Sequence, residues 1–117
     1  MTMSECIFCK IVAGDIPSKK VYEDEDILVF HDIGPLAPVH LLAIPKKHID
    51  SLAESTPEDS PVMGKLLQVG SAMAIEQGCG DGFRTLINTG RVGRQEVYHL
   101  HVHFVGGPEV LPPMLKR

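Results

Sequence analysis

The chain has 117 residues, of which 44% are hydrophobic, so its length suits one compact domain with a modest core. Its formal charge of -4, without any block of Lys or Arg, excludes the basic surface that proteins use to bind a nucleic-acid backbone or an anionic membrane. We therefore expect no nucleic acid and no membrane among its partners.

The cysteines and the first residues predict a compartment. Three cysteines, two of them in Cys6-x-x-Cys9, argue against the disulfide framework of a small secreted domain. Residues 1–5 lack the basic and then apolar segments of a signal peptide. The longest apolar stretch, residues 27–45, is broken by charged residues, histidines and prolines, so it cannot span a bilayer. We expect a cytoplasmic protein.

The first half of the chain predicts one short helix and three strands. Ser4 can cap a helix that ends near Ala13, before Gly14 and Pro17, and Cys6 and Cys9 would share one face of it. The alternating and β-branched patterns predict further elements at residues 21–23, 27–30 and 41–44, the first two paired across the acidic turn 24–26.

A longer helix is predicted from Thr56, Pro57 and Asp59 to about Gln77. It carries two apolar stripes, which are Val62, Leu66, Val69 and Met73, and Met63, Leu67, Gly70 and Ala74. One sheet face would cover only one stripe, which predicts a homodimer that buries the other. The alternative is a helix buried entirely in the core of its own chain.

Two more strands are predicted at residues 83–88 and 97–105, joined by the loop 88–94. Strands and helices follow one another without the regular alternation of a parallel α/β protein. The order therefore predicts an α+β domain with an antiparallel sheet.

The last predicted strand carries three alternating histidines, His99, His101 and His103. Alternate residues of a strand project from the same face about 7 Å apart, so three rings could surround one phosphate-sized anion. The alternatives are a solvent-facing row of histidines and a metal site.

Together with this run, several other segments resemble the histidine triad nucleotide-binding proteins, whose signature is His-x-His-x-His followed by two apolar residues. The segments that carry the resemblance are residues 6–11, 30–33, 37–40, 44–49, Asn88 and 95–99. Val105-Gly106-Gly107 is similar to the phosphoramidase branch, where dinucleoside-polyphosphate hydrolases tend to have Pro-Arg.

The resemblance implies a five-stranded antiparallel sheet with two helices, which dimerises into a ten-stranded sheet. It also implies one domain of this family over residues 1–117, with a core at about 5–107 and a tail at 108–117. The implied activity is hydrolysis of a purine nucleoside phosphoramidate through a covalent nucleotidyl-histidine.

The same resemblance assigns the catalytic residues. His101 would attack the α-phosphorus with its other ring nitrogen donating to a backbone carbonyl, His103 would bind a phosphate oxygen, and His40 and His99 would flank the site. A neutral imidazole is nucleophilic near pH 7 and replaces one difficult displacement by two easier ones.

The implied nucleotide-binding residues are Asp32, Ile33, Phe8, Asn88, Gln95, Glu96 and His103. Asp32 suits the ribose hydroxyls but equally suits a turn at a strand end. Phe8 and Ile33, with neighbours such as Phe30 and Leu42, would cover the purine or belong to the core.

Two positions depart from the family pattern. Arg94 stands where many relatives have a glycine and Glu96 where some have a serine, and Arg94 could hold phosphate or point to solvent. Which group protonates the departing nitrogen stays open.

Cys6, Cys9, His48 and His99 form a second constellation. Cys-x-x-Cys alone fits metal ligands and buried thiols about equally. The resemblance to zinc-binding bacterial-type members favours a structural zinc ion (Zn²⁺), for which four nitrogen and sulfur ligands are usual. His99 would then fix the strand that presents His101.

Two rival functions remain at this point. A purine-nucleotide sensor or scaffold with little turnover would keep the same pocket. A metallohydrolase would use the triad as a catalytic zinc site, against which stand the diverging histidines and the expected lack of a carboxylate partner close by.

Overall fold

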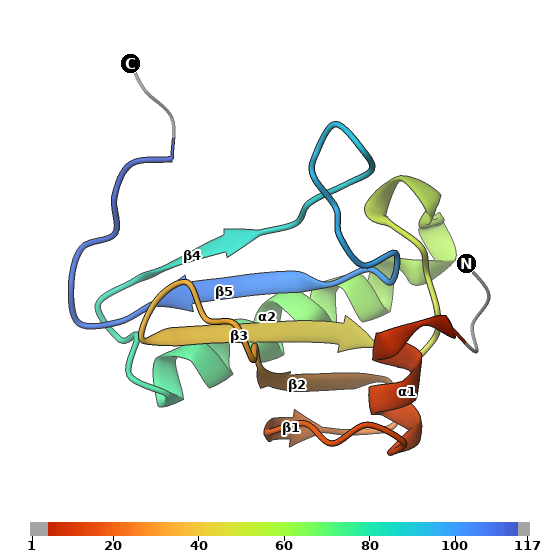
Figure 1. The fold of residues 1–117 in the computed structure, drawn as a ribbon, viewed down its shortest axis with the longest axis horizontal. Coiled ribbons are helices and arrows are strands. Elements are labelled where there is room, and N and C mark those ends of the chain that lie inside the picture. The colour runs from red at the N-terminus through yellow and green to blue at the C-terminus, as the bar shows by residue number, and fades with distance from the viewer. Residues whose placement is uncertain (1–4, 115–117) are drawn as a thin grey trace.

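The centre of the fold is one antiparallel sheet of five strands in the order β1-β2-β3-β5-β4. The computed structural model describes residues 5–114 (Figure 1). The strands are β1 Lys20–Glu23, β2 Ile27–His31, β3 Val39–Pro45, β4 Phe83–Leu86 and β5 Val102–Gly106, and the helices are α1 Ile7–Ala13 and α2 Ser60–Glu76. The 3-10 turns Leu52–Glu54 and Pro57–Asp59 lie between β3 and α2. The predicted α+β fold, with a five-stranded antiparallel sheet and two helices, is confirmed.

Each face of the central strands is covered by a different helix (Figure 1). Leu66, Gly70 and Ala74 are the buried residues of α2, and Leu66 and Ala74 belong to a core cluster with β2, β3 and β5. Phe8 and Ile11 of α1 pack with the alternate residues of β2 and β3. Burial on both faces explains why β2 and β3 are continuous apolar runs in the sequence.

The predicted division of α2 into two stripes is wrong. The buried line Leu66-Gly70-Ala74 takes residues from both stripes, and partly buried residues of both pack against the same core. Helical steps of three and four residues place these side chains in one broad band, which a sheet can cover. Leu67 and Ile75 remain 42% and 52% exposed on the other side.

The ends of the helices follow their capping residues. Thr56 and Asp59 form a reciprocal capping box before α2, as the sequence predicts. Gly14 ends α1 in the left-handed conformation at φ 85°. Cys6 is the N-cap of α1, and its sulfur accepts from the Cys9 amide at 3.3 Å. The predicted cap Ser4 lies outside the described residues.

The last strand is shorter than predicted, because it begins at Val102 rather than at residue 97. The amide of Leu100 donates to the carbonyl of Ile49 at 2.6 Å, which anchors the preceding segment to the residues after β3. Of the three triad histidines, only His103 is therefore on a strand, whereas His99 lies at a bend and His101 directly precedes the ladder. The fourth strand likewise ends at Leu86.

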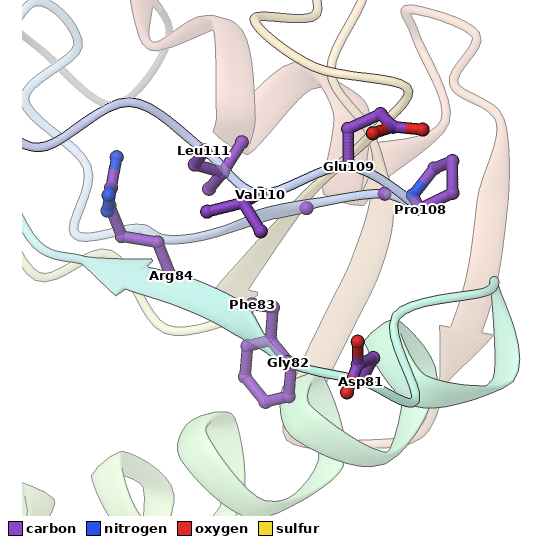
Figure 2. A pocket seen from close by; sticks show the side chains of 10 residues that line it. Asp81, Gly82, Phe83, Arg84, Pro108, Glu109, Val110 and Leu111 are labelled. Carbon is purple, nitrogen blue, oxygen red and sulfur yellow. The ribbon is translucent and has the colours of Figure 1, made fainter.

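The described part of the tail returns to β4, an edge strand of the sheet. Arg84 of β4 donates to the carbonyl of Pro112 at 2.8 Å, and residues 108–111 border a hollow beside Phe83 (Figure 2). Phe83 pairs with Gly106, whereas His103 pairs with Leu86 at the other end of β4. This hollow is therefore separate from the histidines.

We expect Gly70→Ala to lower the free energy of unfolding by about 1–3 kcal/mol, because overpacking strains a filled core. A Cβ at Gly70 would lie 2.2 Å from Cε2 of Phe104. Gly64→Ala is the matched control, since its Cβ would meet nothing within 4 Å and alanine favours the helix. Urea unfolding of both variants checks this, and equal effects would contradict it.

Candidate functional site

Three neighbouring strands, β2, β3 and β5, bring a carboxylate and two imidazoles together. His40 lies on β3 and His103 on the neighbouring β5, and His40 Nε2 lies 2.9 Å from His103 Nδ1. Asp32 directly follows β2, and its Oδ2 lies 3.5 Å from His40 Nε2. The ring centroids of His101 and His103 are 4.9 Å apart. The histidines at positions 40, 101 and 103 thus form one cluster.

The hydrogen bonds of this cluster define its neutral tautomers. The Leu36 amide donates to His40 Nδ1 at 3.1 Å, so the proton of neutral His40 is on Nε2. That proton is donated to His103 Nδ1, which leaves the His103 proton on Nε2. His103 Nε2 is buried and has no partner. An unpaired buried donor is costly, and a ligand oxygen would satisfy it.

His101 presents its other nitrogen differently. Its Nδ1 donates to the His99 carbonyl at 2.8 Å, the backbone bond that the family resemblance implies. In the neutral ring the lone pair is therefore on Nε2, which no residue among 5–114 hydrogen-bonds. The ring is buried, with the edge of Phe8 5.1 Å away between centroids. The imidazole is oriented and its nucleophilic nitrogen is free.

Burial keeps the clustered imidazoles neutral. Desolvation lowers the pKa of His101 and of His40, and with the neighbouring His101 and His40 rings it lowers the pKa of His103 to about 4. The Asp32 carboxylate opposes each shift. Without an anion in the site all three rings are neutral at pH 7.

These shifts predict that the free energy of unfolding falls as the pH falls from about 6.5 to about 4. The reason is that the unfolded chain takes up a proton at His103 in this range, whereas the folded chain does not. Below that range both states are protonated and the loss stops growing. Urea unfolding between pH 7.5 and 4.5 measures the slope, and His103→Gln should flatten it. A slope unchanged by this substitution would contradict the prediction.

His99 does not join the other rings around one anion. Its Nε2 donates to the carbonyl of Pro45 at 2.8 Å, and its Nδ1 faces Cys6 Sγ at 3.3 Å and Cys9 Sγ at 3.5 Å. The contribution of His99 to the cluster is its carbonyl, which holds His101.

The residues expected near the base and ribose have different environments. Asp32 accepts from the Gly34 amide at 2.8 Å through Oδ1, so it caps a turn and also neighbours His40. Ile33 is 97% exposed in the loop that follows β2. Phe8 is buried in the α1 core cluster beneath His101.

The loop before the triad is held by Gln95. Its side chain accepts from the Gly90 amide at 2.9 Å and donates to the carbonyls of Asp50 at 2.7 Å and Val97 at 3.0 Å. With these bonds made, and with its backbone amide donating to the Gly90 carbonyl at 3.0 Å, Gln95 could reach a ligand only through its backbone carbonyl. Asn88 is half-buried after β4, and Glu96 is exposed but close enough to oppose the lowered pKa of His101.

Arg94 is exposed and has φ 62°, in the left-handed region that favours glycine. We expect Arg94→Gly to raise the free energy of unfolding by up to about 1 kcal/mol, because relief of this conformation exceeds the added entropy of the unfolded chain. Arg91→Gly, in the same loop but without positive φ, should instead destabilise. Thermal unfolding of the pair tests this, and a loss of stability in Arg94→Gly would contradict it.

Four soft ligands meet beside the start of α1. Cys9 Sγ lies 3.1 Å from His48 Nδ1, and the four ligand atoms of the cluster are within 4.8 Å of one another; its members are Cys6, Cys9, His48 and His99. His48 Nε2 donates to Asp50 Oδ1 at 2.6 Å and His99 Nε2 to Pro45, so both Nδ1 lone pairs face the thiols. Such outer bonds orient metal-binding histidines, and this group could hold a metal ion.

The Cys9 thiol needs a neighbouring cation to ionise near pH 7. Burial and the neighbouring Cys6 raise the pKa of Cys9 to about 11, because a second buried thiolate is unfavourable. A bound metal ion supplies the opposite charge and deprotonates its thiol ligands.

A second group with metal-binding residue types is Asp32, His40 and His103. The expectation that no carboxylate lies close to the triad is therefore wrong, because the turn after β2 returns Asp32 to β3. The bonds favour hydrogen bonding over metal binding here: neutral His40 has its proton on Nε2, directed at His103 2.9 Å away.

Comparison with known proteins places this fold and site in one family. The family model described as "Scavenger mRNA decapping enzyme C-term binding" matches residues 5–113. Protein HitA of Neisseria gonorrhoeae is 54% identical over 106 residues, which cover 91% of this chain and 99% of HitA. A HIT-like protein of Synechococcus elongatus is 48% identical over 112 residues, or 95% and 98% of the two chains.

Solved structures agree with this assignment. A HIT family hydrolase from Legionella pneumophila superimposes with a TM-score of 0.88 at 43% identity, covering 93% of this chain and 98% of that one. A histidine triad protein from Clostridium difficile also gives 0.88, at 42% identity, with 97% and 99% covered. The chain belongs to the histidine triad (HIT) family. Within residues 5–114, no helix has the length and apolarity to cross a membrane.

Proposed function

We propose that this protein hydrolyses the P–N bond of purine nucleoside phosphoramidates through a covalent nucleotidyl-histidine on His101. The observation that carries this proposal is the pairing of a free lone pair on His101 Nε2 with an unpaired buried donor on His103 Nε2 in the same cluster. The first suits attack on phosphorus, and the second suits one of its oxygens. The Legionella relative, itself described as a hydrolase, supports hydrolytic chemistry.

The reaction has two displacements. His101 Nε2 forms a bond to the α-phosphorus while the bond from phosphorus to the amine nitrogen breaks, and the amine leaves with a proton taken up from solvent. Water then attacks the same phosphorus and returns a proton to solvent as the bond from phosphorus to His101 Nε2 breaks, which releases the nucleotide and restores the neutral imidazole. The His99 carbonyl holds the ring and stabilises the positive charge that it gains on attack, and His103 donates to a non-bridging oxygen.

The nucleoside would lie over the loop that follows β2. Asp32 is positioned beside His40 to accept from ribose hydroxyls, and the exposed Ile33 offers an apolar surface to the purine. Phe8 would support the site by packing edge-on against the His101 ring. Asn88 and Glu96 would line the phosphate and leaving-group side, on the loop that Gln95 holds.

We further propose that Cys6, Cys9, His48 and His99 hold a structural zinc ion. Two sulfurs and two oriented imidazole nitrogens are a donor set that zinc prefers, and four protein ligands leave no open position for catalysis. The ligands come from the start of α1, the segment after β3 and the residue that holds His101. Zinc bound there would cross-link these three segments.

The assembly we propose is a homodimer with a continuous ten-stranded sheet. The exposed Leu67 and Ile75 on α2 support a partner on that side of the molecule. Each subunit would be one HIT domain over residues 1–117, with a core at about 5–107 and a tail at 108–117. Three free cysteines fit the reducing cytoplasm.

A rapid-quench experiment tests the proposed chemistry. Wild-type protein is mixed with adenosine 5′-phosphoramidate, quenched within the first turnovers, and analysed by mass spectrometry under conditions that preserve acid-sensitive adducts. We expect an adenylyl adduct on the peptide that contains His101. Nucleotide binding without adduct or turnover would overturn the enzyme and leave a purine-nucleotide sensor.

A further inference from the structure

Three consecutive residues after β3 contact three parts of the site. His48 faces the sulfur of Cys9 in the metal cluster at 3.1 Å. The carbonyl of Ile49 accepts from Leu100, between His99 and His101, at 2.6 Å. The carbonyl of Asp50 accepts from Gln95 at 2.7 Å. Segment 48–50 therefore touches the metal cluster, the triad backbone and the loop that precedes the triad.

Gln95 makes the connection from this segment to the loop. Its carboxamide is buried, with the oxygen accepting from Gly90 and the nitrogen donating to Asp50 and Val97. A second bond, from the Gln95 amide to the Gly90 carbonyl at 3.0 Å, closes the loop itself. The side-chain nitrogen thus attaches an already closed loop to the residues beside His48. Breaking this attachment would remove the side-chain donor from the carbonyls of Asp50 and Val97.

We propose that Gln95 is a positioning residue that couples metal binding to nucleotide binding. Metal binding fixes His48, and with it the Asp50 carbonyl that holds the loop carrying the nucleotide-facing Asn88 and Glu96. A nucleotide that binds the ordered loop then pays less conformational entropy, so each ligand strengthens the other. This inference rests on the proposed nucleotide and zinc sites. It adds a thermodynamic link between them, through a side chain that contacts neither ligand.

If each ligand strengthens the binding of the other, the coupling can be measured from the affinity for zinc alone, without any assay of activity. The affinity for zinc alone is determined by competition with a chelating dye, in the absence and presence of saturating AMP. In the wild type we expect AMP to tighten zinc binding on the order of 5-fold or more. In Gln95→Met, which keeps the size of the side chain and loses its hydrogen bonds, the ratio should fall to about 1. Gln77→Met, at the exposed end of α2, is the matched control and should keep the wild-type ratio.

Gln95→Glu distinguishes the role of the side-chain oxygen from that of the side-chain nitrogen. An ionised carboxylate still accepts from Gly90 but cannot donate to Asp50, so we expect slow amide exchange at Gly90 together with lost coupling. In Gln95→Met the Gly90 amide should exchange faster. These readouts distinguish loss of the attachment from collapse of the loop.

The outcomes are distinct. A wild-type ratio near 1 with both ligands bound, or coupling retained in Gln95→Met or Gln95→Glu, overturns the positioning role and leaves the proposed function intact. A wild type that fails to bind AMP or zinc overturns the corresponding proposed site, and the coupling with it.

Discussion

His101→Ala is expected to lower kcat for adenosine phosphoramidate by at least about 10⁴-fold, because it removes the atom that would bond to phosphorus. AMP affinity should change only a few-fold, since the unpaired donor of His103 and the Asp32 carboxylate remain. Steady-state kinetics and calorimetric titration with AMP measure the two effects separately. Loss of catalysis with retained binding is the result expected of a residue that acts in the chemical step.

Two substitutions calibrate this result. His103→Ala removes a donor to the phosphate but leaves the nucleophile, so a smaller loss of about 10²–10³-fold is expected. His31→Ala changes a half-buried histidine at the end of β2, away from the bonds of the cluster, and should retain activity. If His101→Ala kept more than about 1% of wild-type kcat, the covalent route would be wrong and water would have to attack phosphorus directly.

The sheet could be predicted because its information is local. Apolar runs in β2 and β3, the capping residues of α2 and Gly14 after α1 each act within a few residues of chain. The start of β5 could not be predicted, because it depends on the bond from Leu100 to Ile49, about 50 residues earlier. The alternating pattern of the triad favours a strand over its whole length. The contact between Leu100 and Ile49 lies outside the ladder, and β5 begins only at Val102.

The residues of the site could be predicted from the sequence only in part, because most of their contacts join distant positions of the chain. Alternation of the histidines predicts that they share one site, and the His101 and His103 rings do lie together, yet the pattern says nothing about His99 turning toward Cys6 and Cys9. Those contacts join residues about 90 positions apart, and only the family resemblance brought them together. The hydrogen-bonding role of Gln95 has no local signal, because a polar residue in a glycine-containing loop looks ordinary until its three partners are placed.

The second large effect is expected at the metal cluster. Cys6→Ser should reduce bound zinc from about one ion per subunit to almost none, because a hydroxyl is a poor ligand for zinc and the remaining three residues cannot close the site. Elemental analysis of purified protein measures the metal directly. With free zinc near 1,000 times the wild-type dissociation constant, the variant should also lose about 4 kcal/mol of unfolding free energy.

The third cysteine provides the control for this substitution. Cys79 is as buried as Cys6 but lies outside the cluster, where its sulfur packs near Gly106. Cys79→Ser therefore carries the same chemical change and the same cost of burying a hydroxyl, without touching the metal ligands. It should keep its zinc. A wild type that is free of metal, and as stable after chelation as before, would show that the two cysteines and two histidines are held together by packing and hydrogen bonds alone.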